Sequence, residues 1–540
     1  MDIILDQGKI YLCRDRFAEA VLIRDGRILM TGTSQEVRLA AGLSPRVIHC
    51  EGRTVIPGFN DSHIHFLQMG ESRQQAQIGE ARSIDQMIAI CRTFIKAHPE
   101  RTSQGLQAAG WNQDLFTDKR IPDRCDLDQI ATDRPVILER VCGHILTVNS
   151  FALQELKRAG LWGQLNREDV MVDGEGEPTG VLAEAACNVV RELIPPFTES
   201  QKRAALQEAM AYALSKGLTS VQSNDVGTST MDAEGTFSLL HSLYESGQGR
   251  IRYHHQVCFQ DPADFRQYLT EGEFAKGHYP ANSYLTLGPL KLFADGSLGA
   301  RTALMKHGFA DDPGNYGLDW MDLSVMEEFC QLAYGHGVQV TTHAIGDQAI
   351  ENVIHCYEKA MAGRGNRYRF IINHCQITSQ ALLERIARAG LCVAAQPIFL
   401  DYDRTIVESR AGKELAKTSY AWKSLKDLGV HVSYGTDSPV EDCNPFPGIY
   451  AAVTRKGLDG TPEGGYQPQE RVDIFDAVDA YTYESAYAQF QEGEKGRIQA
   501  GQVADLVMLE EDLFTCDLDA IPEIAPVLTM VGGKVEYEKR

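Results

Sequence analysis

Pro57-Gly-Phe-Asn-Asp-Ser-His-Ile-His-Phe66 is the stretch around which the rest of the chain is organised. Val55 and Ile56 lead into it as the start of a strand, which Pro57 and Gly58 kink. His63 and His65 are two residues apart, so on an extended strand both imidazoles face the same side. Two imidazoles on one side suit a borderline-soft divalent metal such as zinc. Short His-x-His pairs also arise by chance, so this interpretation depends on further ligands elsewhere in the chain.

The composition is that of an ordinary soluble globular protein, and 540 residues suffice for more than one domain. The formal net charge of -22 argues against nucleic acid or an anionic membrane as a partner, because both require a basic face. The thirteen cysteines include no Cys-x-x-Cys pair, which does not favour a disulfide framework. The sequence shows neither a secretory leader nor an apolar run of ~18 residues. It therefore predicts a cytoplasmic protein that does not span a membrane.

The middle of the chain alternates strand-like and helix-like stretches. This pattern predicts a parallel sheet with helices outside it. About eight strand–helix units fit a (β/α)₈ TIM barrel. The strands are expected at Val55, Leu218–Val221, Arg252–Phe259, Pro289–Ala294, Val338–His343, Tyr368–His374, Leu391–Ala395 and Val430–Thr436.

The two ends of the chain are β-rich instead. Asp25-Gly26 between apolar runs predicts a hairpin, and residues from about 503 onward have strand patterns again. We therefore predict a composite β-sandwich built from residues 1–56 and 490–540, with the barrel over 57–489. Two unrelated terminal hairpins are the alternative. The segment after Phe66 is too long for a simple crossover, so residues 70–185 are predicted as an inserted α+β subdomain over the barrel mouth.

Five of the predicted strands end in metal-capable side chains. In such barrels the C-terminal ends of the strands build the site. The candidate ligands are His63 and His65 together with Lys291, His343, His374 and Asp437. Each has a structural alternative: His343 and His374 as core histidines, Asp437 as a helix cap, and Lys291 as an ion-pair partner of Asp295. Their shared placement favours a metal site.

The pattern resembles the amidohydrolase superfamily, in which ligands follow the first, fifth, sixth and eighth strands. It resembles more narrowly the YtcJ-like branch, which includes N-substituted formamide deformylases. The stretches that carry this likeness are Lys291–Thr302, Gly110-Trp-Asn-Gln113, and His144 followed by Val148–Leu153. The tail Lys495–Leu506 matches the return of that superfamily to its sandwich.

The resemblance implies a ligand assignment. His63, His65 and Asp437 would hold one zinc ion, and His343 and His374 would hold a second. Lys291, carboxylated by carbon dioxide, would bridge the two. The implied activity is hydrolysis of a carbon–nitrogen bond, an amide or N-formyl bond, in a small-molecule substrate with a metal-activated hydroxide. Asp437 would carry the proton to the leaving nitrogen.

Further pocket residues are expected near these ligands. His144 is predicted as a second catalytic residue that donates to the carbonyl oxygen. The predicted substrate-contacting residues are Trp111, Asp295, Arg301 and Tyr316, with Glu184 as another pocket candidate. Structural alternatives stay open: Trp111 as a core anchor of the inserted subdomain, and Asp295 paired with Arg301.

Other functions also stay open. A cyclic-amide hydrolase of the hydantoinase or dihydroorotase kind uses similar ligands. A single-metal deaminase would leave Lys291 without a task, and a non-catalytic scaffold would not need the complete ligand set. The sequence does not determine the oligomeric state and allows a homo-oligomer.

Overall fold

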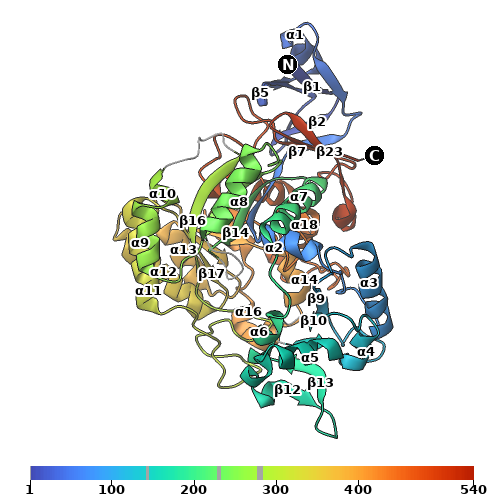
Figure 1. The fold of residues 1–540 in the computed structure, drawn as a ribbon. Coiled ribbons are helices and arrows are strands. Elements are labelled where there is room, and N and C mark those ends of the chain that lie inside the picture. Colours follow the sequence, from blue (N-terminus) through green and yellow to red (C-terminus); the bar gives the residue numbers. More distant parts are fainter. Residues whose placement is uncertain (1, 141–144, 228–232, 277–283, 540) are drawn as a thin grey trace. The chain divides into compact units, whose positions relative to one another are not determined.

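The structure is a computed structural model that describes residues 2–140, 145–227, 233–276 and 284–539. It contains two compact units: Met1–Phe66 together with Ala209–Arg540, and Leu67–Glu208. Figure 1 labels the helices and strands of both units. Within the described ranges, no helix is both long enough and apolar enough to cross a membrane.

Among the described residues of the first unit, eight parallel strands form a barrel sheet. Asp437 N donates to His63 O at 2.8 Å and His65 N donates to Ser438 O at 2.8 Å, and these bonds bridge the last and first strands. The predicted eight-stranded barrel is confirmed. In sheet order the strands are β8 (Phe59–Ile64), β14 (Leu218–Val226), β15 (Arg252–Val257), β16 (Leu285–Phe293), β17 (Val340–Ala344), β18 (Ile371–His374), β19 (Cys392–Ala395) and β20 (Val432–Tyr434).

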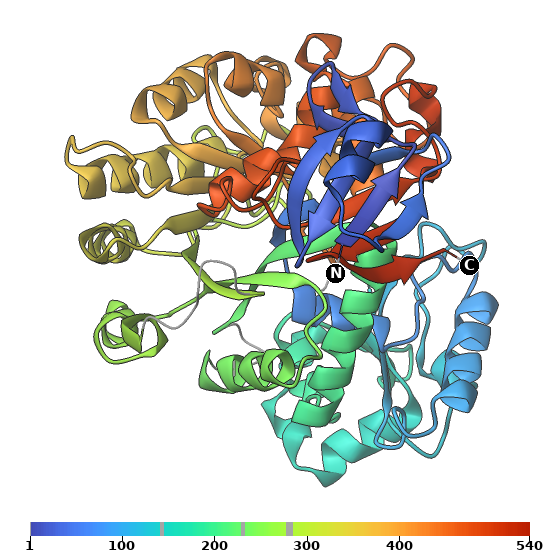
Figure 2. The same ribbon diagram turned by 90° about the horizontal axis from the view of Figure 1, so that it is seen from above.

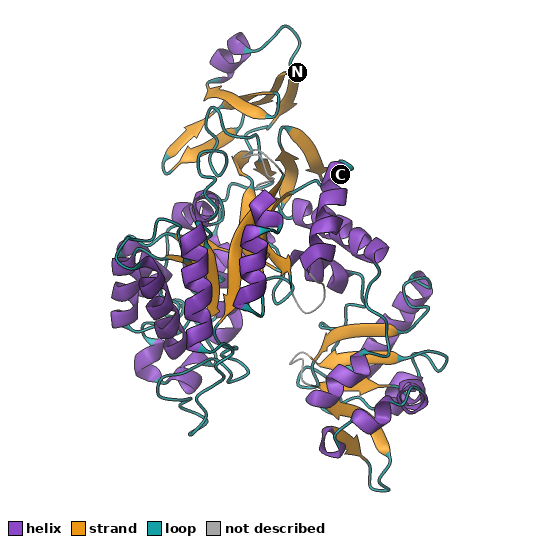
Figure 3. Ribbon diagram, turned by 60° about the vertical axis from the view of Figure 1, so that its left-hand side comes forward, coloured by secondary structure: helices purple, strands orange, loops and turns teal. Residues whose placement is uncertain are grey.

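Helices lie outside these strands (Figure 3). Their ends follow from local sequence: Asp322 caps the start of α11 by accepting from Ser324 N, and Gly337 ends that helix in the left-handed conformation. Ser379 likewise caps the start of α13, and Gly390 ends that helix in the left-handed conformation. The helices of the first unit after the insertion include α8 (Ala233–Glu245), α9 (Pro262–Thr270), α10 (Glu273–Lys276), α11 (Leu323–His336), α12 (Asp347–Met361), α13 (Gln380–Ala389), α14 (Leu400–Asp403), α15 (Val407–Ala411), α16 (Lys413–Ala416), α17 (Trp422–Asp427), α18 (Pro445–Thr454), α19 (Ile474–Ala480) and α20 (Tyr483–Ala488).

The first barrel strand begins later than predicted. Val55 and Ile56 lie in β7 (Thr54–Pro57), which pairs with β21 (Leu506–Leu509) in another sheet. Gly58 separates β7 from β8. A Cβ atom on Gly58 would lie 2.2 Å from Thr219 Oγ1, so only glycine lets the chain pass this close to β14. The stretch Pro57–Phe66 therefore begins at the end of β7 in the sandwich and continues into β8 of the barrel.

Strands from both ends of the chain build a composite sandwich. One sheet has the order β5–β4–β1–β6, and the other β23–β22–β21–β7–β2–β3. Met508 in β21 lies opposite Val55 in β7, and side chains of both sheets, including Leu5, Val21 and Leu506, share one buried apolar cluster. Seen from above, the N-terminal strands in blue and the C-terminal strands in red lie together (Figure 2). The remaining bounds are β1 (Asp2–Asp6), β2 (Lys9–Cys13), β3 (Arg16–Ala18), β4 (Ala20–Arg24), β5 (Arg27–Gly32), α1 (Ser34–Ala40), β6 (Arg46–His49), β22 (Pro526–Val531) and β23 (Lys534–Glu538).

A buried ion pair joins the sandwich to the barrel. Arg252, the first residue of β15, donates from Nε to Asp505 Oδ2 at 2.6 Å and from its guanidinium to Asp505 Oδ1 at 3.1 Å. Gly532 N also donates to Asp505 Oδ1, at 2.8 Å. The Arg252 guanidinium lies 4.5 Å from the centre of the Tyr284 ring. Both charged groups are buried.

The second unit, Leu67–Glu208, is an α+β segment inserted after the first barrel strand. Its sheet order is β12–β13–β11–β10–β9. Val136 and Leu138 of β10 pack into one apolar cluster and Ile137 into another, so both faces of the sheet are covered. The sequence places the insertion at 70–185, and its position over the barrel mouth stays a prediction. The bounds are α2 (Phe66–Arg73), α3 (Ile84–Ala97), β9 (Leu106–Trp111), α4 (Arg124–Asp128), β10 (Val136–Arg140), β11 (Ile145–Val148), α5 (Ser150–Arg158), β12 (Val170–Val172), β13 (Pro178–Ala183), α6 (Ala185–Arg191) and α7 (Glu199–Ser215).

Candidate metal centre

The predicted ligands lie at the C-terminal ends of barrel strands in the first unit. His63, His374 and Asp437 each place one ligand atom within 4.8 Å of the others. The imidazole rings of His343 and His374 have centroids 4.4 Å apart. Lys291 in β16 places its Nζ 3.3 Å from His63 Nε2. The barrel thus gathers these side chains from distant parts of the sequence.

Backbone carbonyls fix the protonation of two histidines. His65 Nδ1 lies 3.2 Å from Asn224 O, and His343 Nε2 lies 3.0 Å from Gly296 O. A carbonyl oxygen only accepts, so in the neutral imidazole the nitrogen facing it carries the proton. The lone pairs are therefore on His65 Nε2 and His343 Nδ1.

Gln396 determines in the same way which ring nitrogen of His374 carries the proton. Its Nε2 donates to Ala394 O at 3.3 Å, which turns its Oε1 toward His374 Nδ1 at 2.6 Å. His374 Nε2 is buried and has no hydrogen-bonding partner among the described residues. A buried imidazole with one nitrogen held and the other lone pair unused is the usual arrangement of a metal-binding histidine.

The distances around Asp437 fit a divalent metal. Asp437 Oδ1 lies 3.2 Å from His65 Nε2 and 3.3 Å from His63 Nε2. A lone pair on His65 Nε2 facing a carboxylate oxygen is repulsive unless a proton or a cation lies between them. Ligand atoms bound at 2.0–2.2 Å to a tetrahedral zinc are themselves about 3.3 Å apart. The donor set and its spacing therefore suit such an ion.

Burial keeps His63, His343 and His374 in the neutral form that binds metals. It lowers the pKa of His63, and the Lys291 charge adds to this effect. Burial also lowers the pKa of His343 and brings that of His374 to about 4. For Asp437 burial alone would raise the pKa, but positive charge, which the facing histidines, above all His63, supply when protonated and a bound cation would supply in their place, holds it below its usual range. Neutral imidazoles around an ionised carboxylate are ligands ready for a cation.

Lys291 is buried, and this burial lowers the pKa of its ammonium to about 8. Its Nζ lies 4.8 Å from the centre of the Phe293 ring. The alternative in which Lys291 pairs with Asp295 is wrong, because that carboxylate accepts backbone N–H bonds from Leu304, Ile345 and Gly346 at 2.9, 3.0 and 2.8 Å. The helix-cap alternative for Asp437 is also wrong, since the next helix, α18, is capped by Asn444.

Residues 46–537 match the model of the amidohydrolase family. The chain belongs to this family. It is 32% identical to YtcJ of Bacillus subtilis (strain 168) over 96% of each chain. It is also 32% identical to LONG AFTER FAR-RED 3 of Arabidopsis thaliana, over 99% of this chain and 91% of that one. N-substituted formamide deformylase of Arthrobacter pascens is 25% identical over 97% of this chain and 96% of its own.

A solved structure supports the same conclusion. An uncharacterized metal-dependent hydrolase from Pyrococcus furiosus superposes with a TM-score of 0.77 at 27% identity, covering 95% of this chain and 100% of that one. Together the family and this structure indicate that the present amidohydrolase is a hydrolase.

Asp295 and Arg301 of this amidohydrolase have other partners than predicted. Burial raises the pKa of Asp295 to about 7, and its three backbone donors tie the loop after β16 to the start of α12. Arg301 binds Asp311 through Nε at 3.2 Å and through its terminal nitrogen at 2.9 Å. The alternative in which Asp295 pairs with Arg301 is therefore wrong. Contact of either residue with a substrate stays a prediction.

The remaining pocket candidates are scattered. Trp111 is fully buried in the second unit, where its Nε1 donates to Leu138 O at 3.0 Å. This position favours the alternative of a core anchor. Glu184 also lies in the second unit, directly before α6. Tyr316 is exposed, and His144 lies outside the described residues.

The sequence reasoning missed the residues that orient the ligands. Gln396 directly follows β19, and Asn224 lies near the end of β14. Both stand at the same C-terminal edge as the metal-capable residues. A search for polar residues at every strand end would have included Gln396 as an orienting side chain, whereas the backbone carbonyls of Asn224 and Gly296 leave no side-chain signal.

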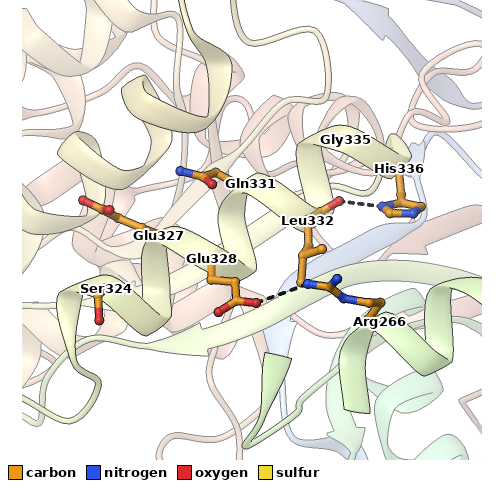
Figure 4. Close-up of a pocket in the computed structure, with 8 residues that line it drawn as sticks. All are labelled: Arg266, Ser324, Glu327, Glu328, Gln331, Leu332, Gly335 and His336. Atoms are coloured by element: carbon orange, nitrogen blue, oxygen red, sulfur yellow. Dashed lines mark hydrogen bonds and ion pairs between the residues drawn. The ribbon is translucent and has the colours of Figure 1, made fainter. Parts of the chain in front are cut away.

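A pocket of about 530 Å³ lies away from these ligands, on the outer helices α9 and α11 (Figure 4). Arg266 binds Glu328 across it at 3.2 Å, and His336 Nδ1 lies 2.9 Å from Leu332 O. These charged and polar groups bind each other, and we assign no chemistry to this pocket. It is lined by Arg266, Ser324, Glu327, Glu328, Gln331, Leu332, Gly335 and His336.

Proposed function

We propose that this amidohydrolase is a metal-dependent hydrolase that cleaves a carbon–nitrogen bond, an amide or N-formyl bond, in a small molecule. The observation that carries the proposal is the approach of Asp437 Oδ1 to His65 Nε2 and His63 Nε2, at 3.2 and 3.3 Å. The relative named N-substituted formamide deformylase supports this bond type.

The ligand assignment is part of the proposal. His63, His65 and Asp437 would hold one ion, and His343 and His374 a second. Lys291, as its carbamate, would lie between them. Zinc is proposed because imidazole and carboxylate donors at this spacing suit it. When bound, the ions supply Lewis acidity, which lowers the pKa of a water molecule and polarises the substrate carbonyl.

The chain's own groups would move the protons. Asp437 is ionised and faces the histidines, so it would accept a proton from the attacking water and deliver it to the leaving nitrogen. An amine leaves poorly without that proton. Lys291, with its pKa lowered to about 8, keeps a fraction of neutral amine near neutral pH. Only the neutral amine can react with carbon dioxide to give the carbamate.

The test combines metal content with turnover. Protein loaded with zinc and bicarbonate is assayed against N-formyl amines, N-acyl amines and cyclic imides. We expect two zinc ions per chain and turnover of the linear compounds. His374→Asn should lose one ion and the turnover, whereas His336→Asn, a matched change on the outer helix α11, should lose neither. Turnover of cyclic compounds alone would indicate a hydantoinase-like enzyme, and absence of both metal and turnover would indicate a non-catalytic scaffold.

A further inference from the structure

We propose that Trp320, Phe293 and Phe399 form an apolar wall beside the metal centre. This wall would select substrates that carry an uncharged, ring-sized apolar substituent next to the scissile bond. The inference rests on the proposed function, because it names the part of the substrate that this site would take.

The wall is continuous with the candidate ligands. The Trp320 ring lies 6.2 Å from the Phe293 ring, which in turn lies 5.8 Å from the His343 ring. Phe399, in the short 3-10 helix Pro397–Phe399 that follows β19, stacks on His374 with a centroid distance of 6.1 Å and an angle of 8°. Aromatic side chains therefore flank both members of the second histidine pair. A substrate bound at those histidines would meet their rings.

Trp320 remains exposed although its segment is held in place. Its side chain is 59% exposed, and those of Leu318 and Tyr316 are 51% and 55% exposed. These three exposed side chains belong to one short segment without regular secondary structure. The backbone is fixed by Trp320 N to Ala294 O at 3.1 Å, Leu318 N to Thr302 O at 3.0 Å and Met305 N to Tyr316 O at 2.9 Å. An exposed apolar side chain that is held in place next to candidate metal ligands is typical of a ligand-binding surface.

The charges nearby disfavour an anionic substituent. Arg301 and Arg410 both bind Asp311, so these two cations are already engaged. On the Asp437 side of the centre, burial raises the pKa of Glu441, and the negative charges of Asp401 and Asp403 add to this effect. An anionic group would be repelled there, whereas a neutral ring would bury the exposed face of Trp320.

The experiment compares two neutral substrates, so that the acidic groups do not decide the result. These are N-(2-phenylethyl)formamide and N-(2-hydroxyethyl)formamide. We expect wild-type protein to prefer the phenylethyl compound in kcat/KM. Trp320→Ala should reduce this preference about 10- to 100-fold, the range for removing an apolar contact from a pocket. Trp320→Phe should restore most of it. Leu39→Ala, which truncates a 79% exposed leucine on α1 of the sandwich, should leave it unchanged.

A binding measurement separates this inference from the proposed function. 3-Phenylpropanamide is titrated into zinc-loaded protein while tryptophan fluorescence is followed, with Trp320→Phe as the reference. A saturable change that Trp320→Phe removes would support the wall even if neither formamide is hydrolysed, in which case only the proposed function fails. Hydrolysis of both formamides with equal kcat/KM, or a preference that Trp320→Ala leaves intact, would overturn the wall while the proposed function stands.

Discussion

Gln396→Leu tests the metal centre through a residue that is not itself a proposed ligand. The substitution removes the acceptor that lies 2.6 Å from His374 Nδ1. The buried N–H would then be unsatisfied, at a cost of about 1–3 kcal/mol. The imidazole can avoid this cost by moving its proton to Nε2, but Nε2 then has no lone pair for a metal. Either outcome weakens the binding of the second metal ion. We expect a loss of about 10- to 100-fold in zinc affinity, the usual effect of removing a residue that orients a ligand.

The assay is a zinc titration against a competing chelator, with circular dichroism to verify the fold. Gln396→Glu keeps an acceptor at the same place and should retain the second ion. Gln380→Leu changes an exposed glutamine of α13 that binds Glu384 at 2.9 Å, and it should bind zinc like the wild type. If Gln396→Leu binds both ions with wild-type affinity, the assignment of His374 Nε2 as a ligand atom is refuted.

Three further predictions follow from other groups. Asp437→Asn has nearly the same shape but cannot accept the proton, so metal-replete protein should lose about 10²–10⁴-fold in turnover; a wild-type rate with full metal content would refute the role. Lys291 has its pKa lowered from 10.5 to about 8, and its neutral fraction therefore increases as pH rises through that value. With the concentration of dissolved carbon dioxide held constant, metal uptake by the apoprotein should accelerate from about pH 7 to pH 9, and an uptake rate that falls over this range would contradict it. Asp505→Ala leaves the buried Arg252 without its carboxylate and should destabilise the first unit by about 3–5 kcal/mol. Pulse proteolysis in urea measures this loss, and a change below about 1 kcal/mol would show that the pair does not stabilise the fold.

Much of the barrel and its candidate ligands was predictable from local patterns. Strand–helix alternation repeats along the chain, and a histidine or aspartate at a strand end is visible in the sequence. His343 and Asp437 were identified in this way. The joining of both chain ends in one sandwich was also predictable in outline, because both ends have strand periodicity, although Val55 of β7 was assigned to the barrel.

What the sequence did not reveal depends on contacts between distant residues. The break between β7 and β8 at Gly58 is set by Thr219 on a neighbouring strand. Arg301 binds Asp311 rather than Asp295 because Asp295 is already occupied by backbone donors. Trp111 has an aromatic side chain, and its residue type alone does not distinguish a pocket position from a core position. Only the packing of the second unit distinguishes these two positions.

The closure of the barrel and the candidate metal centre depend on the same bonds. Asp437 has φ +59°, a left-handed conformation that costs a non-glycine residue about 1–2 kcal/mol. Its backbone N–H donates to His63 O at 2.8 Å, which compensates for this cost. Asp61 accepts from His63 N and from Thr436 N, each at 3.1 Å, and so ties the first strand to the last. Because these bonds fix both backbones, the carboxylate of Asp437 meets the two histidines of the first strand only when the barrel is closed. Formation of the first metal subsite therefore requires closure of the sheet, and binding of an ion there would stabilise the closed barrel in return.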